Sequence, residues 1–342
     1  MNKVKYGALD IFRLIAALLV IAIHTSPLEF ISPAADFFLT RVLARIAVPF
    51  FFMVTGQFVL SRILSGKDGM AVLKKFLIKN SVTYLIAILL YLPFGLYLGH
   101  YKGLGFGGVL KDIFFDGTFY HLWYFPACIM GVLIVFGLSR FLGKKGILIT
   151  VFVLYVIGVF GDSWYGAIQN VPVLSNIYDG FFTVSSYTRN GVFFAPLFLV
   201  LGTYMSRLKS KPKGKENLIL SVAALGLMTA EGYILRAVNF LRHDSMYLTL
   251  PLYVFFFYSF LLSRDVSPNP KARNLSKYIY ILHPIAIMGV REIGRMLKIT
   301  SVIVDIGLLH YILVTVITFA VSIGWIEVWK RCSSKLVKLN WN

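Results

Sequence analysis

The chain has 342 residues, of which 58% are hydrophobic, 16% aromatic and only 14% charged, with a formal net charge of +19. A soluble domain usually has about 25% charged residues, so this composition excludes an ordinary water-soluble protein and indicates that lipid surrounds most of the surface. The positive charge falls in short links between apolar segments rather than on one soluble face, so we expect no nucleic-acid partner.

Apolar runs recur along the whole chain, and a helix rising about 1.5 Å per residue needs such a run to cross a hydrocarbon layer about 30 Å thick. We therefore predict an all-α integral membrane bundle of about ten transmembrane helices, forming a single domain over residues 1–342. The predicted spans are 9–25, 42–62, 81–99, 121–141, 146–161, 192–207, 217–236, 246–263, 277–296 and 302–329.

The Lys and Arg residues are unevenly divided between alternate links. One side has 23 of them, including Lys3 and Lys5, the other has 10, and Arg13 lies within the first span. The positive-inside rule then predicts that both termini are cytoplasmic, with anionic lipids as partners of the basic links. The longest outer link, about 162–190, is rich in Trp and Tyr, which favours either interfacial anchoring or a lid over an outer vestibule.

Ionisable residues within membrane spans are functional candidates because burying a charge in lipid is costly. The first span contains Asp10, Arg13 and His24. Arg13 and His24 are eleven residues apart, which places them about 20° apart around a helix and about 16 Å apart along it. One helix face would thus carry a cation for an anionic donor and a histidine that can act as general base.

Arg13 and His24 also fit simpler roles at the two membrane surfaces. Arg13 could extend to lipid phosphates, and His24 could form hydrogen bonds at the outer interface. We expect Asp10 to form an ion pair with Arg13 across one helical turn.

Later spans contain fewer polar candidates. Thr55 and Gly56 permit close helix approach, whereas the amide of Gln57 needs a buried partner or a ligand. Glu231 either has a structural partner such as Arg236 or contacts a substrate or His24. His283 precedes Pro284, which predicts a helix kink beside a satisfied histidine or a residue lining a tunnel.

At these residues the chain resembles the acyltransferase 3 family of membrane proteins, over nearly its whole length. The most specific likeness is Arg13 followed by His24 after ten intervening residues. The other similar segments are Pro49 to Phe58, His121 to Tyr124, and Tyr280 to Pro284.

The resemblance implies a protein of the bacterial plasma membrane that takes an acyl group, expected to be acetyl, from cytoplasmic acyl-coenzyme A to a hydroxyl on the outer side. It implies that His24 is catalytic and that Arg13 positions the donor. Lys75 and Lys79 stand where the family often has an Arg pair, and lysine meets phosphates as a point charge. Asp10, Tyr280 and His283 would be structural or line the tunnel, and we expect no metal.

Three segments are also similar to the membrane half of vancomycin-resistance serine racemases: Tyr6 to Asp10, Arg189 to Pro196, and His243 to Tyr247. In those proteins the membrane half precedes a cytoplasmic racemase that uses pyridoxal phosphate. We expect this chain to lack that racemase, and to be either an isolated membrane half or a free-standing relative, with a fused or associated racemase as a partner.

The leading hypothesis from the sequence is therefore a membrane O-acyltransferase. The alternative is a carrier that moves L-serine or a similar small amino acid inward, with Glu231, Gln57 and Arg236 as candidate acceptor or solute contacts.

Overall fold

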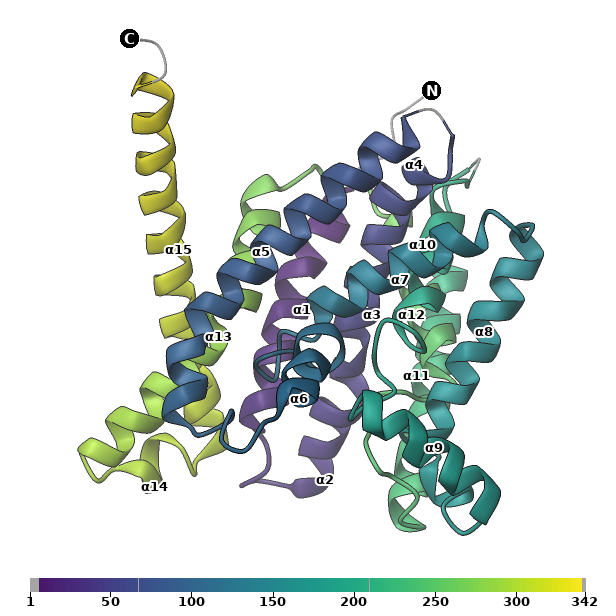
Figure 1. The fold of residues 1–342 in the computed structure, drawn as a ribbon. Helices are drawn as coiled ribbons and strands as arrows, with labels where there is room; N and C mark the ends of the chain where they lie inside the picture. Colours follow the sequence, from purple (N-terminus) through teal and green to yellow (C-terminus); the bar gives the residue numbers. More distant parts are fainter. Residues whose placement is uncertain (1–5, 67, 209, 340–342) are drawn as a thin grey trace. The chain divides into compact units, whose positions relative to one another are not determined.

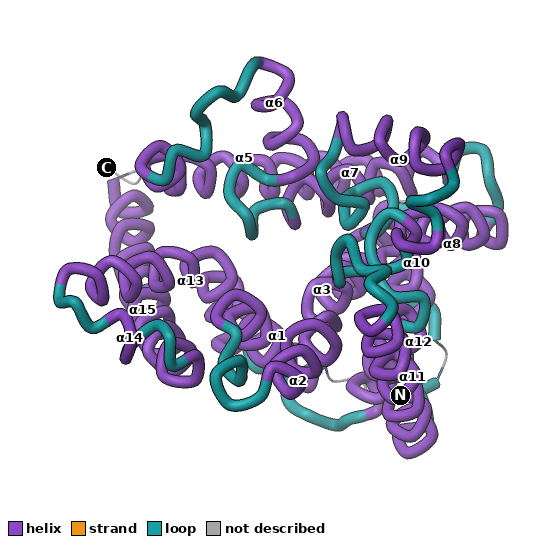
Figure 2. Tube along the Cα trace, turned by 90° about the horizontal axis from the view of Figure 1, so that it is seen from below, coloured by secondary structure: helices purple, strands orange, loops and turns teal. Residues whose placement is uncertain are grey.

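A computed structural model describes residues 6–66, 68–208 and 210–339, with the backbone alone for 329–339. Every regular element in these ranges is a helix (Figure 2), which confirms the all-α prediction. Lys3, Lys5, Lys67 and Lys209, which entered the charge count, lie outside the described residues.

The first elements form three long helical stretches, and the second of these is continuous from Pro33 to Ile63 although its hydrogen-bond pattern changes several times. They are α1 (Gly7–Thr25), α2 (Pro33–Asp36), η1 (Phe37–Val42), η2 (Leu43–Ile46), α3 (Ala47–Thr55), η3 (Gly56–Leu60), α4 (Ser61–Ile63) and α5 (Gly69–Tyr97).

The remaining elements are the helices of the later predicted spans together with short helical pieces in some of the links (Figure 1). They are α6 (Phe106–Lys111), η4 (Asp112–Asp116), α7 (Tyr124–Leu138), α8 (Lys144–Phe160), η5 (Tyr165–Ala167), α9 (Pro172–Val184), α10 (Ala195–Met205), α11 (Gly214–Ala237), α12 (Leu250–Ser263), α13 (Pro270–Met296), α14 (Thr300–Ile303) and α15 (Gly307–Leu339).

All ten predicted spans coincide with helical segments. Within the described residues, five helical stretches are long and apolar enough to cross a membrane, and α7, α10 and α12 are shorter apolar helices. The structure thus has the features of a multi-pass membrane protein, while the count of ten spans stays a prediction.

The contacts divide the chain into two compact units. Unit 1 consists of Met1–Ala47 and Arg264–Asn342, and unit 2 of Val48–Ser263. In unit 1, α1, α13 and α15 pack around a cluster of buried aliphatic side chains that includes Ile21, Ile287 and Val314.

Unit 2 is held by close approach of helix backbones. A Cβ atom added at Gly56 would lie 2.1 Å from the carbonyl oxygen of Leu199, and one added at Gly202 would lie 2.1 Å from that of Met53. The chain at α3 and η3 therefore packs against α10 with almost no side chain between them, as predicted for Gly56.

Candidate functional site

The polar residues of unit 1 begin with Asp10, which is 4% exposed near the start of α1. Its Oδ1 atom accepts a hydrogen bond from Arg13 Nη1 at 3.1 Å and lies 3.7 Å from Arg273 Nε. Its Oδ2 atom accepts a hydrogen bond from the backbone N–H of Asn269 at 3.0 Å. The predicted pair of Asp10 and Arg13 is present, and the same carboxylate also ties α1 to the start of α13.

His24 lies near the other end of α1, where its ring stacks on that of His283 with centroids 5.4 Å apart and an interplanar angle of 20°. His283 Nδ1 is 2.8 Å from the carbonyl oxygen of Tyr280, which can only accept, so Nδ1 carries a proton. Pro284 has no N–H with which to bond that carbonyl in the helix. His283 replaces the missing donor, and its Nε2 atom is then the basic nitrogen when the ring is neutral.

The side chain of Gln57 has a hydrogen-bond partner within unit 2. Its side chain is 5% exposed, and its Oε1 atom accepts a short hydrogen bond from the hydroxyl of Tyr258 on α12. This contact supplies the buried partner that the sequence required of Gln57.

Glu231, on α11, holds the start of α12. Its Oε1 atom accepts hydrogen bonds from Trp164 Nε1 and from the backbone N–H of Leu248, both at 2.8 Å. Its Oε2 atom accepts from the N–H of Thr249 at 3.1 Å and from the hydroxyl of the same residue at 2.6 Å. A carboxylate that accepts four hydrogen bonds at a helix start is a structural cap, formed with partners that the sequence did not indicate.

The remaining predicted binding residues are exposed. Lys75 and Lys79 lie four residues apart on α5 in unit 2, and Arg236 lies in the last turn of α11. Arg13 belongs to unit 1, and Lys75 and Lys79 belong to unit 2. The roles of these three exposed residues stay predictions.

A polar cluster that the sequence did not indicate surrounds Asp162, in the turn after α8. The Asp162 side chain is fully buried, and its Oδ1 atom accepts hydrogen bonds from the N–H groups of Ser245 at 2.7 Å and Met246 at 2.9 Å. Burial raises the pKa of Asp162 to about 6, against the opposing effect of those N–H groups and of Arg189. Asp162 thereby fixes the link that precedes α12.

Two guanidinium groups lie in the links that meet there. Arg189 Nη1 donates to the hydroxyl of Ser245 at 3.1 Å, and its guanidinium lies over the rings of Tyr187 at 4.2 Å and Trp123 at 5.4 Å. Arg242 lies 3.3 Å from the centroid of the Phe182 ring. Cation–π contacts of this kind hold a guanidinium in place without neutralising it. We call Asp162, Tyr187, Arg189, Arg242 and Ser245 the Arg189 cluster.

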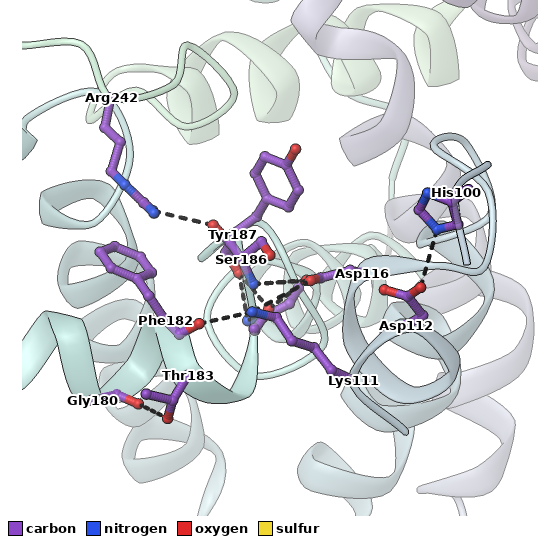
Figure 3. Close-up of polar contacts among 12 residues, drawn as sticks. His100, Lys111, Asp112, Asp116, Gly180, Phe182, Thr183, Ser186, Tyr187 and Arg242 are labelled. Atoms are coloured by element: carbon purple, nitrogen blue, oxygen red, sulfur yellow. Dashed lines mark hydrogen bonds and ion pairs between the residues drawn. The ribbon is translucent and has the colours of Figure 1, made fainter. Parts of the chain in front are cut away.

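The neighbouring contacts keep these links in place (Figure 3). Arg242 Nη1 donates to the backbone carbonyl of Ser186 at 3.1 Å, and the N–H of Ser186 donates to Asp116 Oδ1 at 2.9 Å. Lys111 Nζ donates to the carbonyl of Phe182 at 2.8 Å and lies 4.0 Å from Asp116 Oδ2. The loop at 185–190 is therefore anchored to η4 and to Arg242 independently of Arg189, while Lys111 joins α6 to α9.

Three separate links build the Arg189 cluster, which explains why spacing did not predict it. The available signal was that Asp162 directly follows an apolar span and that Arg189 and Ser245 both lie in the racemase-like segments. Among the described residues, no group of three or more His, Cys, Asp and Glu side chains could hold a metal ion.

The family model described as an acyltransferase domain, Acyl_transf_3, matches residues 6–326. The match covers both units and the segments that carried the sequence resemblance. The chain belongs to the acyltransferase 3 family of multi-pass membrane proteins.

Curated relatives carry different names. Two proteins of Enterococcus faecalis called amino-acid racemase are 40% and 38% identical over 94% and 91% of the chain, but over only 46% and 43% of their own length. A serine/alanine racemase of Enterococcus gallinarum is 34% identical over 92% of the chain and 45% of its own length. The chain thus spans less than half of these relatives, and no solved structure matches it.

Proposed function

We propose that the chain is a membrane carrier that brings L-serine, or an amino acid of similar size, into the cell for racemisation. The names of the relatives favour a carrier over an acyltransferase, because nearly all of this chain corresponds to less than half of each protein named as a racemase. In this proposal a fused or associated racemase that uses pyridoxal phosphate supplies the chemistry.

The meeting of two of the three racemase-like segments carries the proposal. Arg189, from the segment at 189–196, donates to Ser245, from the segment at 243–247, and Asp162 fixes the latter segment through its Oδ1 atom. A zwitterionic amino acid needs a cation for its carboxylate and an acidic group for its ammonium. The Arg189 cluster has both, and the buried Oδ2 atom of Asp162 has no hydrogen-bond partner among the residues that the structure describes.

The proposed topology determines which side of the membrane the Arg189 cluster faces. With about ten spans and both termini in the cytoplasm, the links at 162–190 and 237–249 face the outside of a bacterial plasma membrane. The basic links then face anionic lipid headgroups on the inner side. The solute would meet the Arg189 cluster first and leave toward the racemase.

Proteoliposomes test the proposal directly. Liposomes containing the purified chain are expected to accumulate labelled L-serine above the level of protein-free liposomes, and excess unlabelled L-serine should compete with the label. Acetyl-coenzyme A inside the liposomes should leave the rate unchanged. Protein-containing liposomes that take up no more serine than empty ones would contradict a carrier.

A second candidate is the acyltransferase activity implied by the family. Its support is that His24 lies on the same helix as Arg13 and contacts the ring of His283. His24 would take the proton of an acceptor hydroxyl while Arg13, Lys75 and Lys79 meet the phosphates of acyl-coenzyme A, with acetyl as the proposed group. Binding of acetyl-coenzyme A that weakens on Arg13→Ala, with product formation lost on His24→Ala, would support this candidate. Absence of both effects would remove it.

A further inference from the structure

A cavity of ≈ 440 Å³ lies within unit 2, where α5 and α8 begin and α7 and α10 end. These ends lie together at the upper right of Figure 1. The volume of the cavity is in the range of pockets that hold small ligands. The cavity contains none of the residues of the Arg189 cluster, so its role is separate from the proposed function.

Three cations from three segments line this cavity. Arg140 follows α7, Lys144 begins α8 and Arg207 follows α10. The guanidinium of Arg140 lies 4.6 Å from the centroid of the Phe136 ring, which does not neutralise it. Lys144 and Arg207 form no hydrogen bond or ion pair through their side chains with any residue that the structure describes.

No acidic side chain opposes these charges among the described residues that line the cavity. Asp68 is close in sequence, immediately before Gly69, but it is not one of the lining residues. Helix α8 is 17 residues long, and its N-cap Gly143 has no side chain to bond the first N–H groups. Those groups add positive potential at the same place, so the cavity attracts an anion.

Apart from the three cations and Ser139, whose hydroxyl donates to the carbonyl of Phe136, the described lining residues are apolar or glycine, and this restricts the class of anion that fits. Among these residues Ile63 and Ile147 are buried, whereas Met70 is 60% exposed. A small soluble anion would gain no binding free energy from contact with these apolar side chains. A phosphate joined to an apolar chain would place its charge among the cations and its chain along the apolar residues.

We propose that this cavity binds the headgroup of an anionic glycerophospholipid from the surrounding membrane. The phosphate lies among Arg140, Lys144 and Arg207, and the first part of an acyl chain covers Met70. The lipid relieves the mutual repulsion of the three cations and joins the α4–α5 link to the α7–α8 link. The occupant belongs to the bilayer in which the protein resides.

Lipid binding by the purified full chain tests this proposal, with phosphatidylglycerol and phosphatidylcholine titrated in mixed micelles and followed by native mass spectrometry. Changing Arg140, Lys144 and Arg207 together to Gln should weaken phosphatidylglycerol binding about 100-fold, since each cation near an anionic headgroup contributes about one kcal/mol. The matched control changes Lys102, Arg295 and Lys298 to Gln, which removes the same charge away from the cavity.

A second variant keeps the charges and fills the space. A Cβ atom at Gly143 would meet nothing within 4 Å, and the backbone there is extended, so Gly143→Phe fits and adds a bulky ring at a residue that lines the cavity. It too should reduce phosphatidylglycerol binding at least tenfold. Equal binding of the two lipids, unchanged binding by both variants, or displacement of phosphatidylglycerol by millimolar inorganic phosphate would overturn the proposal.

Discussion

The polar groups of the two units are assembled in different ways. In unit 1, Asp10, Arg13 and His24 lie on one helix, and His283 joins them from its neighbour. In unit 2, Asp162, Arg189 and Ser245 come from three links that are far apart in the sequence. A regular helix arranges the first set along one element, whereas the second set exists only once the links have folded against one another.

The balance of charge also differs. Asp10 already accepts from Arg13 and from the N–H of Asn269, so its charge is largely used in joining α1 to α13. The Arg189 cluster keeps two cations against aromatic rings beside a buried carboxylate. We infer that the contacts of Asp10 mainly stabilise unit 1, while the Arg189 cluster brings guanidinium, hydroxyl and carboxylate groups from separate links to one place.

The largest effect on stability is expected at Asp162. Asp162→Ala leaves the buried N–H groups of Ser245 and Met246 without their acceptor and should lower the free energy of unfolding by about 3 kcal/mol. Asp162→Asn keeps an acceptor oxygen and should cost less than about 1 kcal/mol. Unfolding in detergent, followed by tryptophan fluorescence, compares the two. Equal stability of both variants would show that Asp162 does not hold this link.

Glu231→Gln should have the next largest effect. The variant keeps one acceptor oxygen but turns the other into a donor that faces Thr249, so we expect a loss of about 2 kcal/mol. Glu216→Gln is the matched control, because Glu216 forms an exposed pair with Lys213 that contributes little. If the two variants unfolded at the same denaturant concentration, Glu231 would not be a structural cap.

The acidity of Asp162 predicts a smaller, pH-dependent effect. Its pKa of about 6 in the folded chain is above the usual value, so the folded protein binds the proton more tightly than the unfolded chain. Stability should therefore fall by about 1 kcal/mol as the pH rises from 5 to 7. The variant Asp162→Asn should lose this part of the pH dependence. Identical profiles for the wild type and the variant would contradict the assignment.

The smallest effect is expected for Arg13→Ala. Asp10 keeps the N–H of Asn269 and the guanidinium of Arg273, so the loss should be below about 1 kcal/mol. Asp10→Ala removes the common acceptor and should cost more. Thermal unfolding of both variants ranks them, and a larger loss for Arg13→Ala than for Asp10→Ala would reverse the roles assigned in unit 1.

Local rules predicted much of the fold. Apolar length located all ten helical segments, helix periodicity predicted the contact of Asp10 with Arg13, and residue size predicted the close approach at Gly56. These features depend on residues within one or two turns of each other, or on a simple steric requirement.

The rest of the candidate site depends on long-range contacts. Gln57 meets Tyr258 across 201 residues, and Asp162 meets Ser245 across 83. Periodicity contains no information on which links meet, so the four partners of Glu231 could not be derived from its neighbours in sequence. The same limit applies to Arg189: the sequence shows it only as part of a resemblance, and its contacts supply the basis for its proposed role.

Uptake of labelled L-serine by proteoliposomes containing Arg189→Lys tests whether the Arg189 cluster binds the transported solute. Lysine keeps the charge but loses the planar fork and the stacking on Tyr187 and Trp123. We predict uptake at least tenfold slower than in the wild type, with normal uptake by the control Arg295→Lys, whose side chain pairs with Glu292 on the surface of unit 1. Uptake by Arg189→Lys at the wild-type rate would contradict the account.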